Sequence, residues 1–138
     1  MSVPQDRHGT SFQRSLGLQY HPIDGTSDGV LVELPIRDDL RGPAGSLEGG
    51  VISTIIDCAG AAAVARQLGN LVATQQMSIS FLAPGRLGPV CAAATPLRIA
   101  SDHGVAEVRV VDSGHDDRLM AVALVTVRAL SRRPEGAG

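Results

Sequence analysis

The chain has 138 residues, a formal net charge of −2, 43% hydrophobic residues and only 2% aromatic residues. This length fits one domain with a sizeable core, and that core must be built from Val, Ile, Leu and Ala. The sequence contains no long basic run and no cluster of aromatic side chains for stacking on bases, so we expect no nucleic-acid partner.

The beginning of the chain and its cysteines indicate where the protein works. Residues 1–10 lack the apolar segment of a signal peptide, and no stretch of the sequence suggests a membrane span. Cys58 and Cys91 lie far apart, which fits reduced thiols better than a disulfide framework. We therefore expect a cytoplasmic protein without a membrane partner.

No linker and no internal repeat divides the sequence, so we expect a single domain over residues 1–138. The expected ordered core covers about residues 11–130. The polar ends, residues 1–10 and 131–138, are expected to be flexible tails.

The first elements of the core are short. Ser11–Leu18 is compatible with a lead-in helix. Gln19–Ile23 and Gly29–Ile36 are typical of a β-hairpin, with Asp24 and Gly25 as its turn signal.

A long apolar helix over Glu48–Leu68 is the element around which the rest is organised. Nearly every side chain from Val51 to Ala65 is apolar, which is the pattern of a helix buried on all sides. The polar exceptions are spaced three and four residues apart and therefore share one face: Ser53, Thr54 and Asp57. A carboxylate in such a helix needs a partner, because burying an unpaired charge is costly.

Glycines mark the start of this helix and suggest chemistry. Gly49 and Gly50 leave backbone N–H donors open to an approaching group, two turns before the Asp57 carboxylate. Donors beside a base or nucleophile are the parts of an oxyanion hole. The same residues equally fit a tight turn into a core helix, with Asp57 hydrogen-bonded to a neighbouring hydroxyl.

Beyond the stop signal at Gly69-Asn70 the chain is strand-like, and Pro96 indicates a bulge or a sheet edge. The expected strands are Val72–Leu82, Val90–Ala100, Val105–Val111 and Leu119–Leu130, joined by turns at 84–88, 101–104 and 112–117. In the first of them Met77, Ile79 and Phe81 share one face. The fold class is therefore α+β, an antiparallel sheet wrapped around one long central helix. One sheet covers only one side of that helix, so a second copy of the chain is expected to cover the other.

Several known motifs are absent from the sequence. Val51 stands where a phosphate-binding loop needs lysine, and the chain contains no G-x-S-x-G, H-E-x-x-H or C-x-x-C. No metal site is therefore expected.

Two segments resemble the hotdog-fold thioesterases of the PaaI-like (4HBT) superfamily. Gly45–Asp57 (GSLEGGVISTIID) is similar to the family's G-x-x-H-G-G segment, which a catalytic acid follows nine residues after the histidine; Asp57 lies nine residues after Glu48. Ala73–Gly88 (ATQQMSISFLAPGRLG) is similar to the family's second strand, which commonly closes in F-L-x-P-x-x-x-G. The similarity extends over roughly residues 18–130.

This resemblance implies an acyl-CoA thioesterase and assigns roles to residues. Asp57 matches the carboxylate that acts as nucleophile or general base, and Gly49 matches the glycine whose N–H polarises the thioester carbonyl. Thr74 matches a Ser/Thr position that orients the water or the carboxylate. Further candidates for contact with the substrate are Gly50, Ser53 and Thr54, with Arg86, Arg118 and Arg128 as candidates for the CoA phosphates.

The resemblance also implies partners. The substrate would be a thioester of CoA or of an acyl-carrier protein, the CoA moiety enters with the substrate, and no resident cofactor is expected. Family members form homodimers or dimers of dimers with the site at the dimer interface, so the N–H donor and the carboxylate can come from different subunits.

Two positions depart from the family pattern. Glu48 replaces a histidine and Gly42 replaces an asparagine, and both family residues help to bind and polarise the thioester. Glu48 is thus either a first-turn acid stabilised by the helix dipole or a second catalytic base beside Asp57.

The alternatives to a thioesterase are a hotdog protein that binds acyl thioesters without hydrolysing them, and a hotdog hydratase or lyase. The lack of a histidine at the helix entry makes the hydratase or lyase the weaker interpretation.

Overall fold

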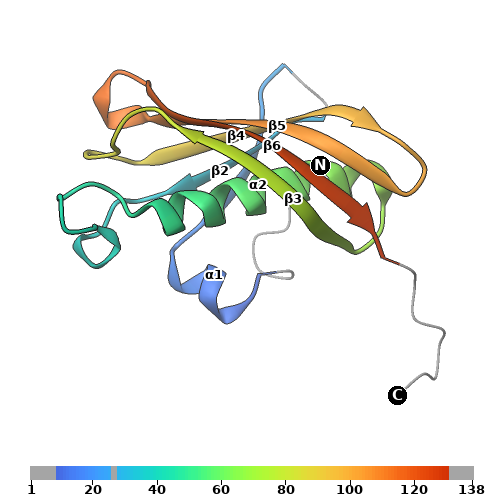
Figure 1. Ribbon diagram of the computed structural model, residues 1–138, viewed down its shortest axis with the longest axis horizontal. Helices are drawn as coiled ribbons and strands as arrows, with labels where there is room; N and C mark the ends of the chain where they lie inside the picture. Colours follow the sequence, from blue (N-terminus) through green and yellow to red (C-terminus); the bar gives the residue numbers. More distant parts are fainter. Residues whose placement is uncertain (1–8, 26–27, 131–138) are drawn as a thin grey trace.

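The computed structural model describes residues 9–25 and 28–130, and it consists of one antiparallel sheet that curves around one long helix (Figure 1). The six strands follow the order β1-β2-β4-β5-β6-β3. This architecture confirms the predicted α+β class. The elements are α1 (Ser11–Ser15), β1 (Gln19–Pro22), β2 (Val30–Leu34), the 3₁₀ helix η1 (Asp38–Leu40), α2 (Gly49–Leu68), β3 (Val72–Phe81), β4 (Val90–Ile99), β5 (His103–Asp112), the 3₁₀ helix η2 (Ser113–His115) and β6 (Arg118–Ala129).

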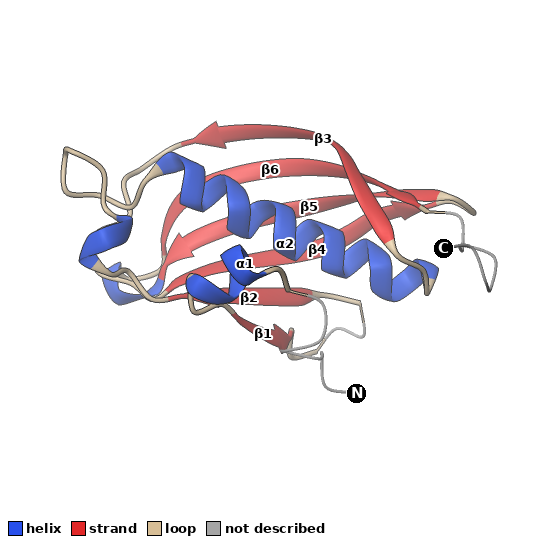
Figure 2. Ribbon diagram, turned by 90° about the horizontal axis from the view of Figure 1, so that it is seen from below, coloured by secondary structure: helices blue, strands red, loops and turns tan. Residues whose placement is uncertain are grey.

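The core lies between α2 and the inner face of the sheet, and Figure 2 shows α2 running across all the longer strands. Large side chains such as Ile55 and Ile56 have no exposed surface, and each contributes about 1.5–3 kcal/mol by leaving water. Gly60 lets the helix approach the sheet closely, since a Cβ there would lie 2.8 Å from the Cβ of Val125. Small residues at the contact therefore set how near α2 comes to the strands.

Both ends of α2 lie where the sequence predicts them. Glu48 is the N-cap residue in an extended conformation, and Gly69 is the C-cap with φ +68°, a left-handed conformation that glycine adopts without strain. The N–H of Gly69 donates to the carbonyl of Ala65 at 2.8 Å. The helix thus begins one residue after the position that replaces the family histidine.

The expectation that no segment resembles a membrane span is wrong for α2. By length and mean hydropathy this helix is long and apolar enough to cross a membrane, contrary to the expectation that no stretch of the sequence suggests a membrane span. Half of the qualifying window is buried inside the protein, because the sheet covers it. A core helix passes the same test of length and composition as a membrane span.

Several boundaries differ from those expected. The lead-in helix ends at Ser15, since Gly17 turns the chain with φ +74°. Strand β5 begins at His103 and not after the expected turn at 101–104, because His103 pairs with Arg128 of β6. Pro96 lies at a bulge, and β4 is an inner strand between β2 and β5. Of the expected flexible tails, residues 1–8 and 131–138 lie outside the described residues.

Strand β3 is one edge of the sheet and carries no charged side chain over its ten residues. Pairing with β6 fixes its two faces: Met77, Ile79 and Phe81 lie opposite inward-facing residues, as the alternation predicts. The register shifts between Thr74 and Gln76, which is a bulge near the start of the strand. A long, uncharged edge strand is a ready template for pairing with another chain.

Candidate active site

Asp57 and Thr74 are in direct contact. Asp57 lies in the interior of α2, and Thr74 lies on the inward face of β3 beside the bulge, opposite the buried Val127. The Thr74 hydroxyl donates a hydrogen bond of 2.6 Å to Oδ1 of Asp57, and both side chains are half-buried. Bulges re-aim side chains near sites in many sheets. Among the described residues, Oδ2 of Asp57 has no recorded hydrogen-bond partner.

The start of α2 presents two free donors. The N–H groups of Val51 and Ile52 both donate to the carbonyl of Glu48, at 3.0 and 3.1 Å. Within the described residues no acceptor is recorded for the N–H groups of Gly49 and Gly50. Gly50 is exposed, and a Cβ at this position would meet nothing within 4 Å, so no side chain crowds the helix start there. The helix dipole adds a partial positive charge at the same place.

The side chains next to these donors are arranged differently from what the sequence suggested. Ser53 and Thr54 donate their hydroxyl hydrogens to the carbonyls of Gly49 and Gly50, each at 2.9 Å, and so bond within the helix. Glu48 is exposed and forms no side-chain bond to the helix start. Its carboxylate therefore does not occupy the two free donors.

Within one chain, the Asp57 carboxylate and the Gly49 N–H lie too far apart to act on the same carbonyl group. Gly49 and Asp57 are eight residues apart, which places their backbones about 12 Å apart along the helix axis at 1.5 Å per residue. A carbonyl carbon and its oxygen are separated by about 1.2 Å. A single chain thus holds the two parts of the chemistry at separate points along α2.

The loop from Pro84 to Gly88 lies beside the helix start and is held by Asp112. The sequence suggested only a turn at this aspartate. Asp112 is the last residue of β5, has no exposed surface, and accepts N–H groups of Arg86, Leu87 and Gly88 at 2.9, 3.2 and 2.8 Å. Burial alone would raise the pKa of the Asp112 carboxyl, but the three N–H donors outweigh it and lower the pKa. Asp112 is therefore a charged anchor for this loop.

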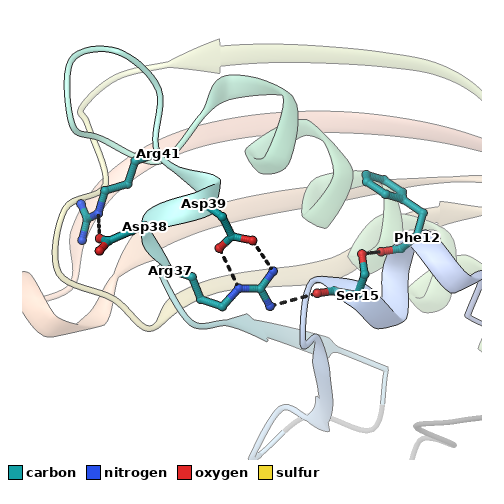
Figure 3. Close-up of polar contacts among 6 residues, drawn as sticks. All are labelled: Phe12, Ser15, Arg37, Asp38, Asp39 and Arg41. Carbon is teal, nitrogen blue, oxygen red and sulfur yellow. Dashed lines mark hydrogen bonds and ion pairs between the residues drawn. The ribbon is translucent and has the colours of Figure 1, made fainter.

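Arg41 is a second residue that sequence analysis missed. It follows η1, donates to the carbonyls of Gly45 and Arg86 at 2.7 and 3.1 Å, and pairs with Asp38 at 3.3 Å (Figure 3). The position of Arg41 directly before the glycine-rich segment was the one signal available, and it says nothing of these partners.

The three arginines proposed for CoA phosphates lie in different places. Arg86 lies in the loop next to the helix start with its side chain exposed, and Arg118 donates to the carbonyl of Pro84 at the same end of the sheet. Arg128 pairs with Ala73 on the outer face of the sheet, away from α2. The structure therefore brings Arg86 and Arg118 near Gly49 and leaves Arg128 apart.

Cys58 follows Asp57 but is a poor nucleophile. Its side chain is 6% exposed, and burial raises the pKa of its thiol. Tyr20 of β1 lies close to this thiol, and burial likewise raises the pKa of the Tyr20 phenol. A protonated thiol attacks slowly. Cys58 and Cys91 are both free cysteines in this structure.

A hollow of about 420 Å³ lies elsewhere, between the β1–β2 side of the sheet and the β3–β4 loop. Its lining includes Glu33, Pro35 and Leu87 but neither Asp57 nor Gly49. In residues 9–25 and 28–130 no three His, Cys, Asp or Glu side chains cluster to hold a metal ion. The chemistry-bearing groups of α2 therefore lie outside this hollow.

Comparison with known proteins places this arrangement in a family. A family profile described as Thioesterase superfamily matches residues 44–119, more than half of the chain, and this segment contains both Gly49 and Asp57. Among curated proteins, VNG_1336C of Halobacterium salinarum, named as a candidate esterase, is 37% identical over 97 residues. That match covers 64% of this chain and 64% of the relative, so just under two thirds of the relative is spanned.

Solved structures agree in fold. AziG of S. sahachiroi superposes with a TM-score of 0.79 at 31% identity, over 91% of this chain and 100% of that one. The E. coli PaaI protein, from the phenylacetic acid degradation operon, gives a TM-score of 0.78 at 20% identity, over 88% of this chain and 86% of that one. The chain therefore belongs to the thioesterase superfamily and has the hotdog fold of its PaaI-like members.

Proposed function

We propose that this protein hydrolyses acyl thioesters, with Asp57 as the general base or nucleophile and the Gly49 N–H as the donor to the carbonyl oxygen. The observation that carries the proposal is the 2.6 Å hydrogen bond from Thr74 to Asp57 in the interior of an otherwise apolar helix. Thr74 leaves one carboxylate oxygen available and holds the other in place. As a general base, Asp57 takes a proton from water, the water oxygen adds to the thioester carbon, and the C–S bond breaks to release the thiol. As a nucleophile, Asp57 attacks that carbon, the thiol leaves, and water then hydrolyses the resulting anhydride to the carboxylic acid and free Asp57.

Two copies of the chain form the site in this proposal. The axial separation of about 12 Å between Gly49 and Asp57 prevents one chain from supplying both groups to one thioester. The uncharged edge of β3 carries Thr74 near one end and Phe81 beside Gly49 at the other. Antiparallel pairing of two β3 edges therefore brings Thr74 and Asp57 of one copy toward Gly49 of the other.

The substrate class we propose is a thioester of CoA or of an acyl-carrier protein. Arg86 and Arg118 lie at the helix-start end of the sheet, where their charges would attract the phosphate groups common to both carriers. The adjoining Phe81 and Leu82 are 54% and 55% exposed and offer apolar surface for an acyl chain. The reaction needs water and no resident cofactor.

The test is thiol release from a panel of short, long and aromatic acyl-CoA thioesters, followed with a thiol-reactive dye. The proposal predicts turnover of at least one class, together with a rise in the melting temperature when a non-hydrolysable acyl-CoA analogue binds. Thermal protection by acyl-CoA without release of thiol from any member would favour the non-hydrolytic binding protein. An absence of both would overturn the thioester proposal.

A further inference from the structure

We propose that Arg41 is a positioning residue for thioester hydrolysis, one that fixes where the Gly49 and Gly50 N–H groups lie. Its guanidinium ties the Gly42–Leu47 loop, which leads into α2, to the β3–β4 loop beside it. This inference rests on the proposed function, in which those N–H groups bind the thioester oxygen.

The guanidinium of Arg41 bridges two loops that lie far apart in the sequence. Nη1 donates to the carbonyl of Gly45 at 2.7 Å, and Nη2 donates to the carbonyl of Arg86 at 3.1 Å. Nε faces the carboxylate of Asp38 at 3.3 Å (Figure 3). The guanidinium donates from three nitrogens on one rigid plane, whereas the lysine ammonium donates from a single nitrogen, so lysine cannot span the same three acceptors.

The far side of this bridge is itself anchored. The peptide N–H of Arg86 donates to Oδ2 of the buried Asp112 at 2.9 Å, while its carbonyl accepts from Arg41. The next carbonyl back, that of Gly85, accepts the N–H of Leu47 at 2.9 Å. Asp112 thus holds the β3–β4 loop as a fixed support, and Arg41 and Leu47 attach the Gly42–Leu47 loop to it.

The loop that Arg41 holds is bonded to the residues directly before the Gly49 and Gly50 donors. Leu47 pairs with Arg41 in an isolated β-bridge, and the N–H of Glu48 donates to the carbonyl of Leu40 at 3.0 Å. Gly49 is the next residue, so these bonds set the direction of its N–H. A misplacement of about 1 Å at a reacting group can cost about 10²-fold in rate.

Arg37 provides a matched control four residues earlier. It also pairs with an aspartate, Asp39, at 3.0 Å and donates to a backbone carbonyl, that of Ser15, at 2.9 Å. Figure 3 shows these bonds on the side of η1 opposite to Arg41. Arg37 therefore loses the same chemical groups on substitution but touches neither loop at the helix start.

The experiment compares Arg41→Ala, Arg41→Lys and Arg37→Ala in the full chain by kinetics and by amide hydrogen exchange. Arg41→Ala is expected to lower kcat for thiol release at least about 10-fold with KM changed less than about 2-fold, because one donor lost from an oxyanion hole costs about 10²–10³. Guanidinium added to Arg41→Ala is expected to restore part of kcat. Arg41→Lys is expected to remain impaired, and Arg37→Ala to keep the parental kcat.

Hydrogen exchange tests the positioning without any turnover. The amides of Leu47 and Glu48 are expected to exchange at least about 10-fold faster in Arg41→Ala and at the parental rate in Arg37→Ala. Equal exchange in the two alanine variants, or faster exchange with parental kcat, would overturn the inference. If the parental protein releases no thiol and Arg41→Ala still speeds amide exchange, the proposed function is refuted. Arg41 is then only a structural bridge between the two loops. If Arg41→Ala does not fold, the same comparison is made with Arg41→Lys and Arg37→Lys.

Discussion

Oδ1 of Asp57 accepts the Thr74 hydroxyl at 2.6 Å, across the contact between the central helix and an edge strand. The bond fixes one carboxylate oxygen of a residue that is otherwise surrounded by apolar helix positions. The bond therefore joins the central helix directly to the edge strand at the candidate site.

Replacing Thr74 with Val removes this hydroxyl while keeping the shape and the strand preference of the side chain. We expect kcat for thiol release to fall about 10- to 100-fold, since a hydrogen bond to a charged group contributes about 1.5–3 kcal/mol. Thr74→Ser restores the donor and is expected to stay within about 3-fold of the parent. Equal turnover by the Val and Ser variants would show that the hydroxyl has no part in the chemistry.

Replacing Glu48 with Gln keeps the shape of an exposed N-cap residue and removes its charge. We expect thiol release to hold steady or rise, because the variant has no negative charge beside the helix start to repel the developing oxyanion. The rise should be clearest at higher pH. A loss of about 10²-fold with unchanged acyl-CoA binding would instead identify Glu48 as a second catalytic base.

The edge of β3 predicts a folded oligomer. At micromolar concentration, light scattering is expected to return a multiple of the 14.3 kDa chain mass. Lysines in place of Ser78 and Ser80 put like charges along this edge, and they are expected to lower both the oligomer mass and kcat. A particle of 14.3 kDa with intact circular dichroism in the parental protein would contradict the shared site.

The Asp112 carboxylate is expected to make a pH-dependent contribution to the free energy of unfolding. Its folded pKa lies below the ordinary value of 3.8, so its charge stabilises the fold at every pH above 3.8 and the contribution is lost as the pH falls through the folded pKa. Asp112→Asn should lower the free energy of unfolding by about 1–3 kcal/mol at pH 7, because the amide cannot accept all three N–H groups.

Urea unfolding at pH 7 and near pH 3, at one protein concentration, measures this contribution. The difference between parent and Asp112→Asn is expected to shrink at the acid pH, because pH 3 lies below the ordinary pKa of 3.8 and the carboxyl of the unfolded chain is then mostly protonated. A gap of the same size at both values would show that Asp112 acts through packing and not through its charge.

Local patterns in the sequence account for most of the fold. The apolar run from Val51 to Ala65 predicted a buried helix, and the alternation of Met77, Ile79 and Phe81 predicted which face of β3 points inward. The start of β5 was misplaced because Asp102, His103 and Gly104 are turn-forming residues. In the structure, pairing with β6 overrides that local preference.

The supports of the candidate site were beyond sequence reasoning. Asp112 and Arg41 bind main-chain groups of Arg86 that lie 26 and 45 residues away. Any residue except proline could supply these N–H and carbonyl groups, so no side-chain pattern reveals the partner. Asp57 was identifiable because a lone carboxylate interrupts an apolar helix, whereas Asp112 lies among other polar residues.

The most direct test is thioester hydrolysis by Asp57→Asn beside the parental protein, on the acyl-CoA that the parent turns over fastest. The amide is nearly isosteric and can accept the Thr74 hydroxyl, but it can neither take a proton nor attack a carbonyl. We predict a loss of about 10²-fold or more in kcat, with unchanged circular dichroism, oligomer mass and binding of a non-hydrolysable analogue. Hydrolysis at the parental rate by the folded variant would contradict the account and make Asp57 a structural residue.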